Sequence, residues 1–185
     1  MITTDYKEIF NLDKAILDEI DPEIYKLLSF WKSRENKITV FTSGSTGSPK
    51  KINIYKNQMI ASAKNTLDYF EIKDNSTFLS CLPVKYIGGK MILIRAILSK
   101  SKIVLCKPSI NPINELNTEI DFIALTPLQL NSLLEKKNIF KKIKLAIIGG
   151  GLVSKNLISK IQNLNTSCFQ TYGMTETISH IALRN

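Results

Sequence analysis

The chain has 185 residues, which is enough for one compact domain with a hydrophobic core and hardly enough for two. Hydrophobic residues make up 44% and charged residues 22%, as in an ordinary globular protein. The 25 Lys and Arg residues outnumber the 16 Asp and Glu residues, but they are scattered singly or in pairs. The formal charge of +9 therefore indicates solvated faces rather than a nucleic-acid surface, although a positive field also suits small anionic substrates.

Cysteine and histidine usage excludes a metal centre built from sulfur and nitrogen ligands. The three cysteines are far apart and form no CxxC pair, and His180 is the single histidine. Each cysteine lies in an apolar run, so we interpret all three as core residues. The N-terminus lacks a basic segment followed by an apolar one, and no apolar stretch reaches the length of a membrane span. We expect a cytoplasmic protein without a membrane span.

The first third of the chain predicts two helices followed by two strands. Thr4 or Asp5 can cap a first short helix, and residues 21–23, Asp-Pro-Glu, open a second one. Residues 37–42 are rich in β-branched side chains, and residues 51–55 alternate as a second strand does. Residues 57–70 then have helical spacing.

After residue 76 the pattern alternates between strand and helix. Strands are predicted at 77–82, 102–106, 121–125, 143–148 and 166–170, and helices at 89–98, 112–117, 127–136 and 154–164. This alternation indicates an α/β layered domain, with a mostly parallel sheet and flanking helices. In such domains ligands bind beyond the carboxyl ends of the strands, so the loops at those ends are the candidate functional segments.

The first candidate loop, residues 42–50, reads Thr-Ser-Gly-Ser-Thr-Gly-Ser-Pro-Lys. Its two glycines allow successive backbone N–H groups to face one anion, its hydroxyls add donors, and Lys50 adds a positive charge. These groups suit the β- and γ-phosphates of a nucleotide. The loop is not a Walker loop, because Pro49 precedes the lysine where that motif has glycine. The alternative interpretation is a flexible surface turn.

Two further loops follow predicted strands. Residues 148–154 place Gly149, Gly150 and Gly151 between a strand and a Ser-capped helix, where a ligand can approach the backbone closely. Residues 171–177 combine an aromatic ring, a glycine, hydroxyls and a carboxylate, which can stack on a purine, contact a phosphate and hold Mg²⁺. Each loop by itself is equally consistent with a tight structural turn.

Together these motifs make the chain resemble the adenylate-forming enzymes, which include acyl-CoA synthetases, peptide-synthetase adenylation domains and luciferases. Residues 42–50 match the family pattern Thr-Ser-Gly-Ser-Thr-Gly-x-Pro-Lys, although Lys51 stands where glycine usually follows. Residues 172–176 match Tyr-Gly-x-Thr-Glu, and residues 149–151 match the intervening glycine-rich loop. The resemblance covers roughly residues 38–185, and both motifs occur in the family's order.

The resemblance implies that ATP activates a carboxylic acid as its acyl-adenylate, and that a thiol, usually coenzyme A, then captures the acyl group. It implies that Tyr172 stacks on adenine, Thr175 contacts the α-phosphate and Glu176 binds Mg²⁺. Lys50, Thr175 and Glu176 are the expected catalytic residues. The expected nucleotide-binding residues are Thr42, Ser43, Gly44, Ser45, Thr46, Gly47, Lys50, Gly149, Gly150, Gly151, Tyr172, Gly173 and Thr175.

A narrower resemblance concerns residues 82–89, Leu-Pro-Val-Lys-Tyr-Ile-Gly-Gly, which occupy the place of the family's Leu-Pro-x-x-His-x-x-Gly segment. The segment and the short N-terminal region look like the o-succinylbenzoate–CoA ligases of menaquinone synthesis. Tyr86, Gly88 and Ser179 would then flank the acyl pocket. Lys90 or Arg95 could bind the second carboxylate of the substrate, but we favour a solvated helix face for both.

The expected domain layout is a helical N-terminal extension over residues 1–36 and part of the large N-terminal AMP-binding domain over residues 37–185. The family's ribose-binding aspartate and small C-terminal catalytic domain have no counterpart here. We therefore expect an incomplete ligase that is impaired in adenylation. A non-catalytic nucleotide-binding module is the alternative, and a basic nucleic-acid-binding domain would rest on net charge alone.

Overall fold

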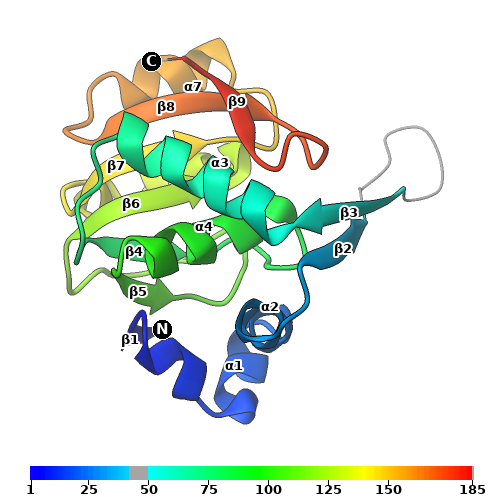
Figure 1. The fold of residues 1–185 in the computed structure, drawn as a ribbon. Coiled ribbons are helices and arrows are strands. Elements are labelled where there is room, and N and C mark those ends of the chain that lie inside the picture. Colours follow the sequence, from blue (N-terminus) through cyan, green and yellow to red (C-terminus); the bar gives the residue numbers. More distant parts are fainter. Residues whose placement is uncertain (42–49, 185) are drawn as a thin grey trace.

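A computed structural model describes residues 1–41 and 50–184, which form one seven-stranded sheet, a separate hairpin and flanking helices (Figure 1). The sheet has the order β1-β5-β4-β6-β7-β8-β9. Its strands are β1 (Ile2–Asp5), β4 (Thr77–Ser80), β5 (Lys102–Leu105), β6 (Ile120–Leu125), β7 (Ile143–Ile148), β8 (Ser167–Gly173) and β9 (His180–Arg184). The five inner strands are parallel, and β1 and β9 pair antiparallel at the two edges. The predicted α/β class with a mostly parallel sheet is confirmed.

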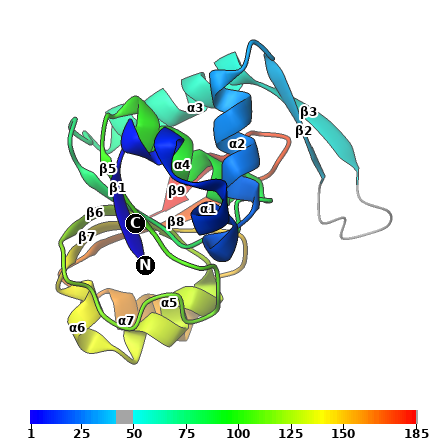
Figure 2. The same cartoon turned by 90° about the horizontal axis from the view of Figure 1, so that it is seen from below.

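Helices cover both faces of the sheet, as Figures 1 and 2 show. The helical elements are a 3₁₀ turn (Glu8–Asn11), α1 (Lys14–Ile20), α2 (Glu23–Lys32), α3 (Lys56–Tyr69), α4 (Ile87–Leu98), α5 (Pro127–Leu134), α6 (Lys137–Phe140) and α7 (Lys155–Ile161). One core cluster joins the sheet to α1, α2, α3 and α4, and a second joins it to α5, α6 and α7. The strands β4, β5, β6 and β7 are mostly apolar because both of their sides are largely buried, whereas β8 is more polar and partly exposed.

Helix starts follow from local sequence. Thr126 accepts a hydrogen bond from the backbone N–H of Gln129, which caps α5 directly after β6, and Ser154 accepts from Leu157 in the same way to cap α7. The Ser154 cap was predicted from sequence. Because both caps follow the carboxyl end of a strand, they fix the direction in which each connection leaves the sheet.

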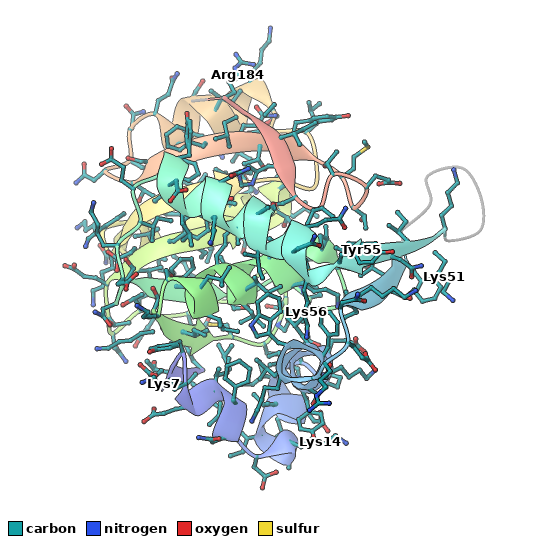
Figure 3. The ribbon with its side chains drawn as sticks, in the orientation of Figure 1. Lys7, Lys14, Lys51, Tyr55, Lys56 and Arg184 are labelled. Atoms are coloured by element: carbon teal, nitrogen blue, oxygen red, sulfur yellow. The ribbon has the colours of Figure 1, made fainter. Side chains whose placement is uncertain are left out.

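The strands β2 (Lys37–Phe41) and β3 (Lys51–Tyr55) form a two-stranded antiparallel hairpin apart from the main sheet. Val40 and Ile54 on one side of it are buried in the first core cluster. Figure 3 labels Lys51 and Tyr55 along β3, and the hairpin projects toward the side at which the parallel strands end (Figure 1). The hairpin thus presents its far end beside the edge where ligands were expected.

Two local predictions were wrong. The short helix expected to carry Ile9 and Phe10 is present as the 3₁₀ turn Glu8–Asn11, but neither Thr4 nor Asp5 caps it. Both residues lie in β1, which pairs with the free edge of β5. Residues 112–117 form no helix, since Lys136 and Lys142 donate to carbonyl and amide oxygens of this segment. The final strand β9 was not anticipated.

The cysteines are buried and free, as predicted. Burial raises the pKa of Cys106 and of Cys168 to about 11, so neither is a thiolate near neutral pH. None of the helices within the described residues is both long and apolar enough to span a bilayer.

Candidate functional site

The carboxyl ends of β7 and β8 bring two of the three predicted loops together. Ile148 pairs with Gln170, so Gly149 and Thr171 follow side by side. The Thr171 hydroxyl donates to the carbonyl of Ile148 at 3.2 Å, and a Cβ at Gly149 would lie 2.5 Å from that hydroxyl oxygen. The glycine loop and the tyrosine loop therefore form one continuous edge.

The three glycines after β7 have different roles. The N–H of Gly149 already donates to the carbonyl of Leu125 at 3.0 Å, so this residue serves the packing of β7 against β6 and Thr171. Gly150 has a φ of +76°, which favours glycine, and the nearest atom to a Cβ there would be 4.0 Å away. At Gly151 the nearest atom would be 3.5 Å away, on Pro127. Gly150 and Gly151 thus present open backbone to a ligand.

The segment after β8 folds back sharply before β9. Gly173 packs against the backbone of Ser179 and His180, where a Cβ would clash. The Thr177 hydroxyl accepts from the backbone N–H of Met174 at 2.9 Å and donates to the carbonyl of Ser179 at 2.7 Å. These bonds fix the turn that carries Thr175 and Glu176. The role of Thr177 was not predicted from the sequence. A hydroxyl side chain three residues after Met174 could have indicated it, because such a side chain can bond to the backbone of a turn.

The functional groups of this turn face solvent. The ring of Tyr172 is 62% exposed at the end of β8, and Glu176 is exposed while Thr175 is half-buried. Within residues 1–41 and 50–184 the carboxylate of Glu176 has no hydrogen-bond or ion-pair partner, and no group of three acidic, His or Cys residues could hold a metal. A cation at Glu176 would therefore need further oxygen ligands from a bound phosphate or water.

The segment between β4 and α4 carries the predicted acyl-pocket residues. Tyr86 lies at the N-terminus of α4 with 46% of its surface exposed, and the Lys85 ammonium lies 4.8 Å from its ring centroid. A Cβ at Gly89 would clash with the backbone of Pro83, and one at Gly88 would lie 3.3 Å from Leu82. Both glycines allow the loop to lie directly on the first turn of α4.

Arg95 does not lie on a solvated helix face, because its side chain is 1% exposed. Its Nη2 donates to the Ser179 hydroxyl at 2.7 Å, which joins α4 to the turn before β9. Within the described residues its Nε has no hydrogen-bond partner, and no carboxylate pairs with the guanidinium. Burial lowers the pKa of Arg95 to about 9, which leaves it charged at neutral pH.

His180 extends this network to α3. Its Nδ1 lies 3.4 Å from the Ser179 hydroxyl, and its Nε2 lies 3.4 Å from the Thr66 hydroxyl. Thr66 donates to the carbonyl of Ser62, so its oxygen accepts from Nε2–H, and Nδ1 accepts from Ser179. Burial, followed by the charge of Arg95, lowers the pKa of His180 to about 4. The ring is neutral near pH 7.

Lys90 is also buried, with 4% of its surface exposed, which again contradicts the solvated face favoured from sequence. Its Nζ donates to the carbonyl of Val84 at 2.7 Å. Burial lowers the pKa of Lys90. Helix α4 is apolar on nearly all sides and lies between the sheet and α3, so both of its cations are largely shielded from bulk water.

The predicted phosphate-binding residues 42–49 lie outside the described residues. These include Thr42, Ser43, Gly44, Ser45, Thr46 and Gly47. Lys50 is described, and it lies exposed next to the Phe41–Lys51 pair of the hairpin. The structure therefore places Lys50 and the β7–β8 edge, and it leaves the position of the loop's other residues as a prediction.

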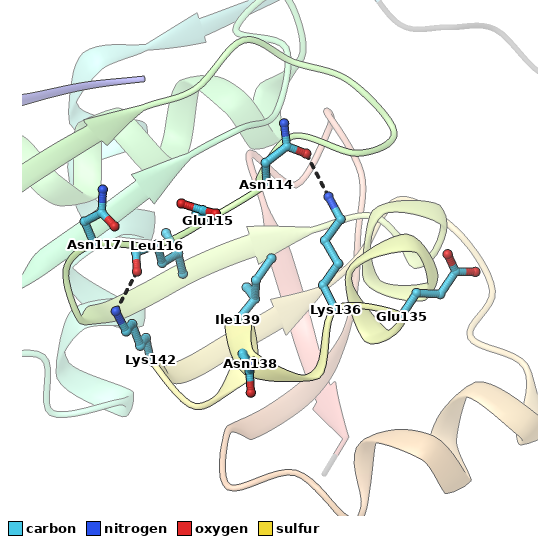
Figure 4. Close-up of a pocket in the computed structure, with 9 residues that line it drawn as sticks. All are labelled: Asn114, Glu115, Leu116, Asn117, Glu135, Lys136, Asn138, Ile139 and Lys142. Atoms are coloured by element: carbon cyan, nitrogen blue, oxygen red, sulfur yellow. Dashed lines mark hydrogen bonds between the residues drawn. The ribbon is translucent and has the colours of Figure 1, made fainter.

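A hollow of about 560 Å³ lies elsewhere, before the amino ends of β6 and β7 (Figure 4). Lys136 Nζ donates to Asn114 Oδ1 at 2.8 Å, and Lys142 Nζ donates to the carbonyl of Leu116 at 2.6 Å. The two ammonium groups thus hydrogen-bond residues 111–117 to the segments on either side of α6. The hollow is at the opposite strand ends from the predicted site and contains none of its residues.

Comparison with known proteins identifies the family of the chain. Residues 28–185 match the family model of the AMP-binding enzymes. A 2-succinylbenzoate–CoA ligase from Bacillus cereus is 30% identical over 154 residues, covering 80% of this chain and 32% of the ligase. An enzyme of the same name from Bacillus mycoides is 31% identical over 156 residues, with the same coverage of 80% and 32%. The chain thus spans about a third of the length of these curated relatives.

Solved structures give the same result. An acyl-CoA synthetase (AMP-forming)/AMP-acid ligase II-like protein from Dyadobacter fermentans superposes with a TM-score of 0.89 at 31% identity, covering 99% of this chain and 53% of that one. The o-succinylbenzoate coenzyme A synthetase of Bacillus subtilis, in complex with AMP, gives 0.71 at 28% identity, covering 80% and 31%. With the family model matched over most of its length, this chain belongs to the AMP-binding enzyme family.

Proposed function

We propose that this chain forms the nucleotide- and acyl-binding part of an ATP-dependent carboxylic acid–CoA ligase, with o-succinylbenzoate of menaquinone biosynthesis as the acid, in the cytoplasm. The observation that carries the proposal is the sheet edge where the glycine loop after β7 contacts Thr171 through Gly149, directly before Tyr172 and the turn of Glu176. An open glycine backbone beside an exposed aromatic ring suits a flat purine with an attached phosphate. The similarity to 2-succinylbenzoate–CoA ligases supports the choice of acid.

The reaction would proceed in two steps. The substrate carboxylate attacks the α-phosphorus of ATP, the bond to the β-phosphate oxygen breaks, and pyrophosphate leaves. The thiol of coenzyme A then attacks the acyl carbon of the adenylate and releases AMP. Both steps require positioning and neutralisation of charge more than covalent help from the protein.

Each predicted residue has a proposed task. Tyr172 stacks on adenine, Thr175 contacts the α-phosphate, and residues 42–47 with Lys50 bind the departing phosphates. Glu176 is exposed and without a partner within the described residues, so its carboxylate fits Mg²⁺ together with phosphate oxygens. The bound Mg²⁺ would neutralise negative charge on the phosphates. The fixed turn around Thr177 keeps Thr175 and Glu176 in place for these tasks.

Arg95 supports a dicarboxylic substrate. A buried guanidinium whose Nη2 binds a neutral hydroxyl, and whose Nε has no partner within the described residues, would gain most from a carboxylate. The second carboxylate of o-succinylbenzoate provides such a group. Tyr86 and Gly88, on the loop before α4, and Ser179, on the turn that binds Arg95, would line the same acyl pocket.

Binding calorimetry tests the nucleotide site directly. Tyr172→Ala should weaken AMP binding about tenfold, since stacking of one base contributes about 1–3 kcal/mol. Tyr69→Ala is the matched control, because Tyr69 is also 62% exposed but lies on α3. Glu176→Gln should leave AMP binding within about twofold and weaken binding of ATP with Mg²⁺ about tenfold.

Two outcomes separate the ligase from its alternatives. ATP–pyrophosphate exchange that depends on o-succinylbenzoate supports the proposal. Because we expect the chain to be impaired in adenylation, absence of exchange does not decide; an o-succinylbenzoyl-adenylate analogue that binds no more tightly than AMP would instead favour a non-catalytic nucleotide-binding module. Equal loss of AMP binding in Tyr172→Ala and Tyr69→Ala would contradict the assigned adenine site.

A further inference from the structure

Asp21 joins the N-terminal helices to the loop that precedes α4. It lies between α1 and α2, where its backbone N–H donates to the carbonyl of Leu17 at 2.8 Å and its carbonyl accepts from Ile24 at 3.0 Å. Its Oδ1 accepts from the N–H of Glu23 at 3.0 Å, and its Oδ2 accepts from the N–H of Val84 at 2.7 Å. Asp21 is 8% exposed, so the bond to Val84 is shielded from water.

The other side of the same peptide segment is held by Lys90. Its Nζ donates to the carbonyl of Val84 at 2.7 Å, and Val84 itself is buried. The two backbone polar groups of one residue are thus bound by two buried side chains of opposite charge, one from the N-terminal helices and one from α4. Charge-assisted hydrogen bonds of this kind are about twice as strong as neutral ones.

Asp21 lies before residue 28, where the match to the family model begins. The loop that it holds leads from Ser80 at the end of β4 to Tyr86 at the start of α4, and the N–H of Tyr86 donates to the carbonyl of Pro83 within it. The loop also contacts the rest of the molecule through the buried side chain of Val84, through Leu82 and through Gly89 against Pro83, but these are packing contacts and do not bind the polar groups of Val84. The position of the loop therefore depends on Asp21 and Lys90, which lie outside both residues 82–89 and the nucleotide motifs.

We propose that Asp21 and Lys90 are positioning residues, which clamp Val84 and thereby hold the residue 82–86 loop as a wall of the acyl pocket. The inference rests on the proposed function, because it assigns the loop to binding of the acyl group. It gives the N-terminal helices a role in substrate recognition, and it assigns Lys90 to the loop rather than to the substrate carboxylate. The nucleotide edge at β7 and β8 is independent of the clamp.

Asp21→Ser tests the clamp with little change in local structure. Serine can still accept from the N–H of Glu23 as a cap does, but its shorter side chain does not reach Val84. Asp13→Ser is the matched control, because Asp13 accepts from the N–H two residues on, Ala15, in the same way and is exposed. If Asp21→Ser does not fold, Lys90→Met takes its place, since it keeps the aliphatic stem and removes the donor to Val84.

Two measurements on the full 185-residue chain are decisive. Amide hydrogen exchange at Val84, followed by NMR, should become at least tenfold faster in Asp21→Ser and stay unchanged in Asp13→Ser. Calorimetry with AMP and with a non-hydrolysable o-succinylbenzoyl-adenylate analogue should show the analogue's affinity falling about five- to tenfold in Asp21→Ser, with AMP affinity unchanged. A purely structural role of Asp21 would weaken both ligands alike.

The outcomes distinguish this inference from the proposed function. If the unmodified chain binds neither ligand, the proposed function fails and the inference fails with it. If the unmodified chain binds both but Val84 exchange is unaltered in the variant, the clamp is refuted while the proposed function stands. Faster exchange with an unchanged affinity ratio of the two ligands refutes the loop as an acyl-pocket wall.

Discussion

Helix α4 carries two buried cations, and their surroundings differ. Lys90 binds the carbonyl of Val84, whose N–H is in turn bound by the carboxylate of Asp21. Arg95, further along the helix, binds the neutral hydroxyl of Ser179, and the neutral ring of His180 is next in the network. Neither cation forms an ion pair within the described residues, but the nearby carboxylates of Glu23 and Asp21 favour the charged form of Lys90, whereas burial alone acts on Arg95.

The different surroundings of Lys90 and Arg95 indicate different roles for the two side chains. A buried charge without a counter-ion destabilises a protein, so it persists where a ligand supplies the opposite charge. A buried charge that binds a backbone carbonyl and has carboxylates nearby stabilises the fold instead. We therefore assign Lys90 to the scaffold of the loop before α4, and we propose that Arg95 binds the ligand. Replacing each of them by methionine tests this contrast at two positions of the same helix.

The largest effect is expected for Arg95→Met on ligand affinity. Removing one member of a buried charge pair costs about 2–5 kcal/mol, so binding of an o-succinylbenzoyl-adenylate analogue should weaken about 100-fold. An analogue that lacks the second carboxylate should bind the variant and the unmodified chain alike. Isothermal calorimetry with both analogues makes the comparison, and equal losses for the two would contradict the assigned role of Arg95.

Lys90→Met should have its main effect on stability. It leaves the buried carbonyl of Val84 without its donor, which costs about 1–3 kcal/mol. Arg95→Met should change stability by less than about 1 kcal/mol, because it also removes an uncompensated buried charge. Urea unfolding of both variants measures the difference. A larger loss in Arg95→Met than in Lys90→Met would reverse our assignment of the two cations.

The smallest effect concerns pH. The pKa of His180 falls from 6.5 to about 4 on folding, so the unfolded chain binds more protons between these values. Stability from this group is complete above about pH 6.5 and is lost as the pH falls toward 4. Since the ring is partly exposed, the loss should be about 1–2 kcal/mol. His180→Gln should abolish this part of the pH dependence in urea unfolding at pH 7.5 and 4.5, and an identical profile would contradict it.

The sequence predicted the parallel inner strands of the sheet but neither of its two edge strands. Apolar runs such as residues 143–148 and caps such as Ser154 are local signals, and both were confirmed. The edge strands β1 and β9 were missed, because an edge strand forms by pairing with a distant partner rather than by local preference. The helix expected at residues 112–117 does not form, because Lys136 and Lys142, which are distant in sequence, donate to backbone carbonyls of this segment.

For the candidate site, the motifs predicted which residues matter but not how their neighbours hold them. Glycine, aromatic and carboxylate groups after successive parallel strands must meet at one sheet edge, so the proximity of Gly149 to Thr171 follows from topology. Lys90 and Arg95 were misjudged, because polar side chains on a helix usually face water. Here α4 is covered by the sheet, α3 and the N-terminal helices.

The sequence by itself determined the fold class, the order of the motif loops and the chemical groups they carry, because these depend on periodicity and on residue types within a few positions. The tertiary structure alone decided that Asp21 reaches Val84 and that Arg95 reaches Ser179. These pairs are 63 and 84 residues apart in the chain. Contacts over such separations arise from how layers pack, and packing is a property of the whole core rather than of any local segment.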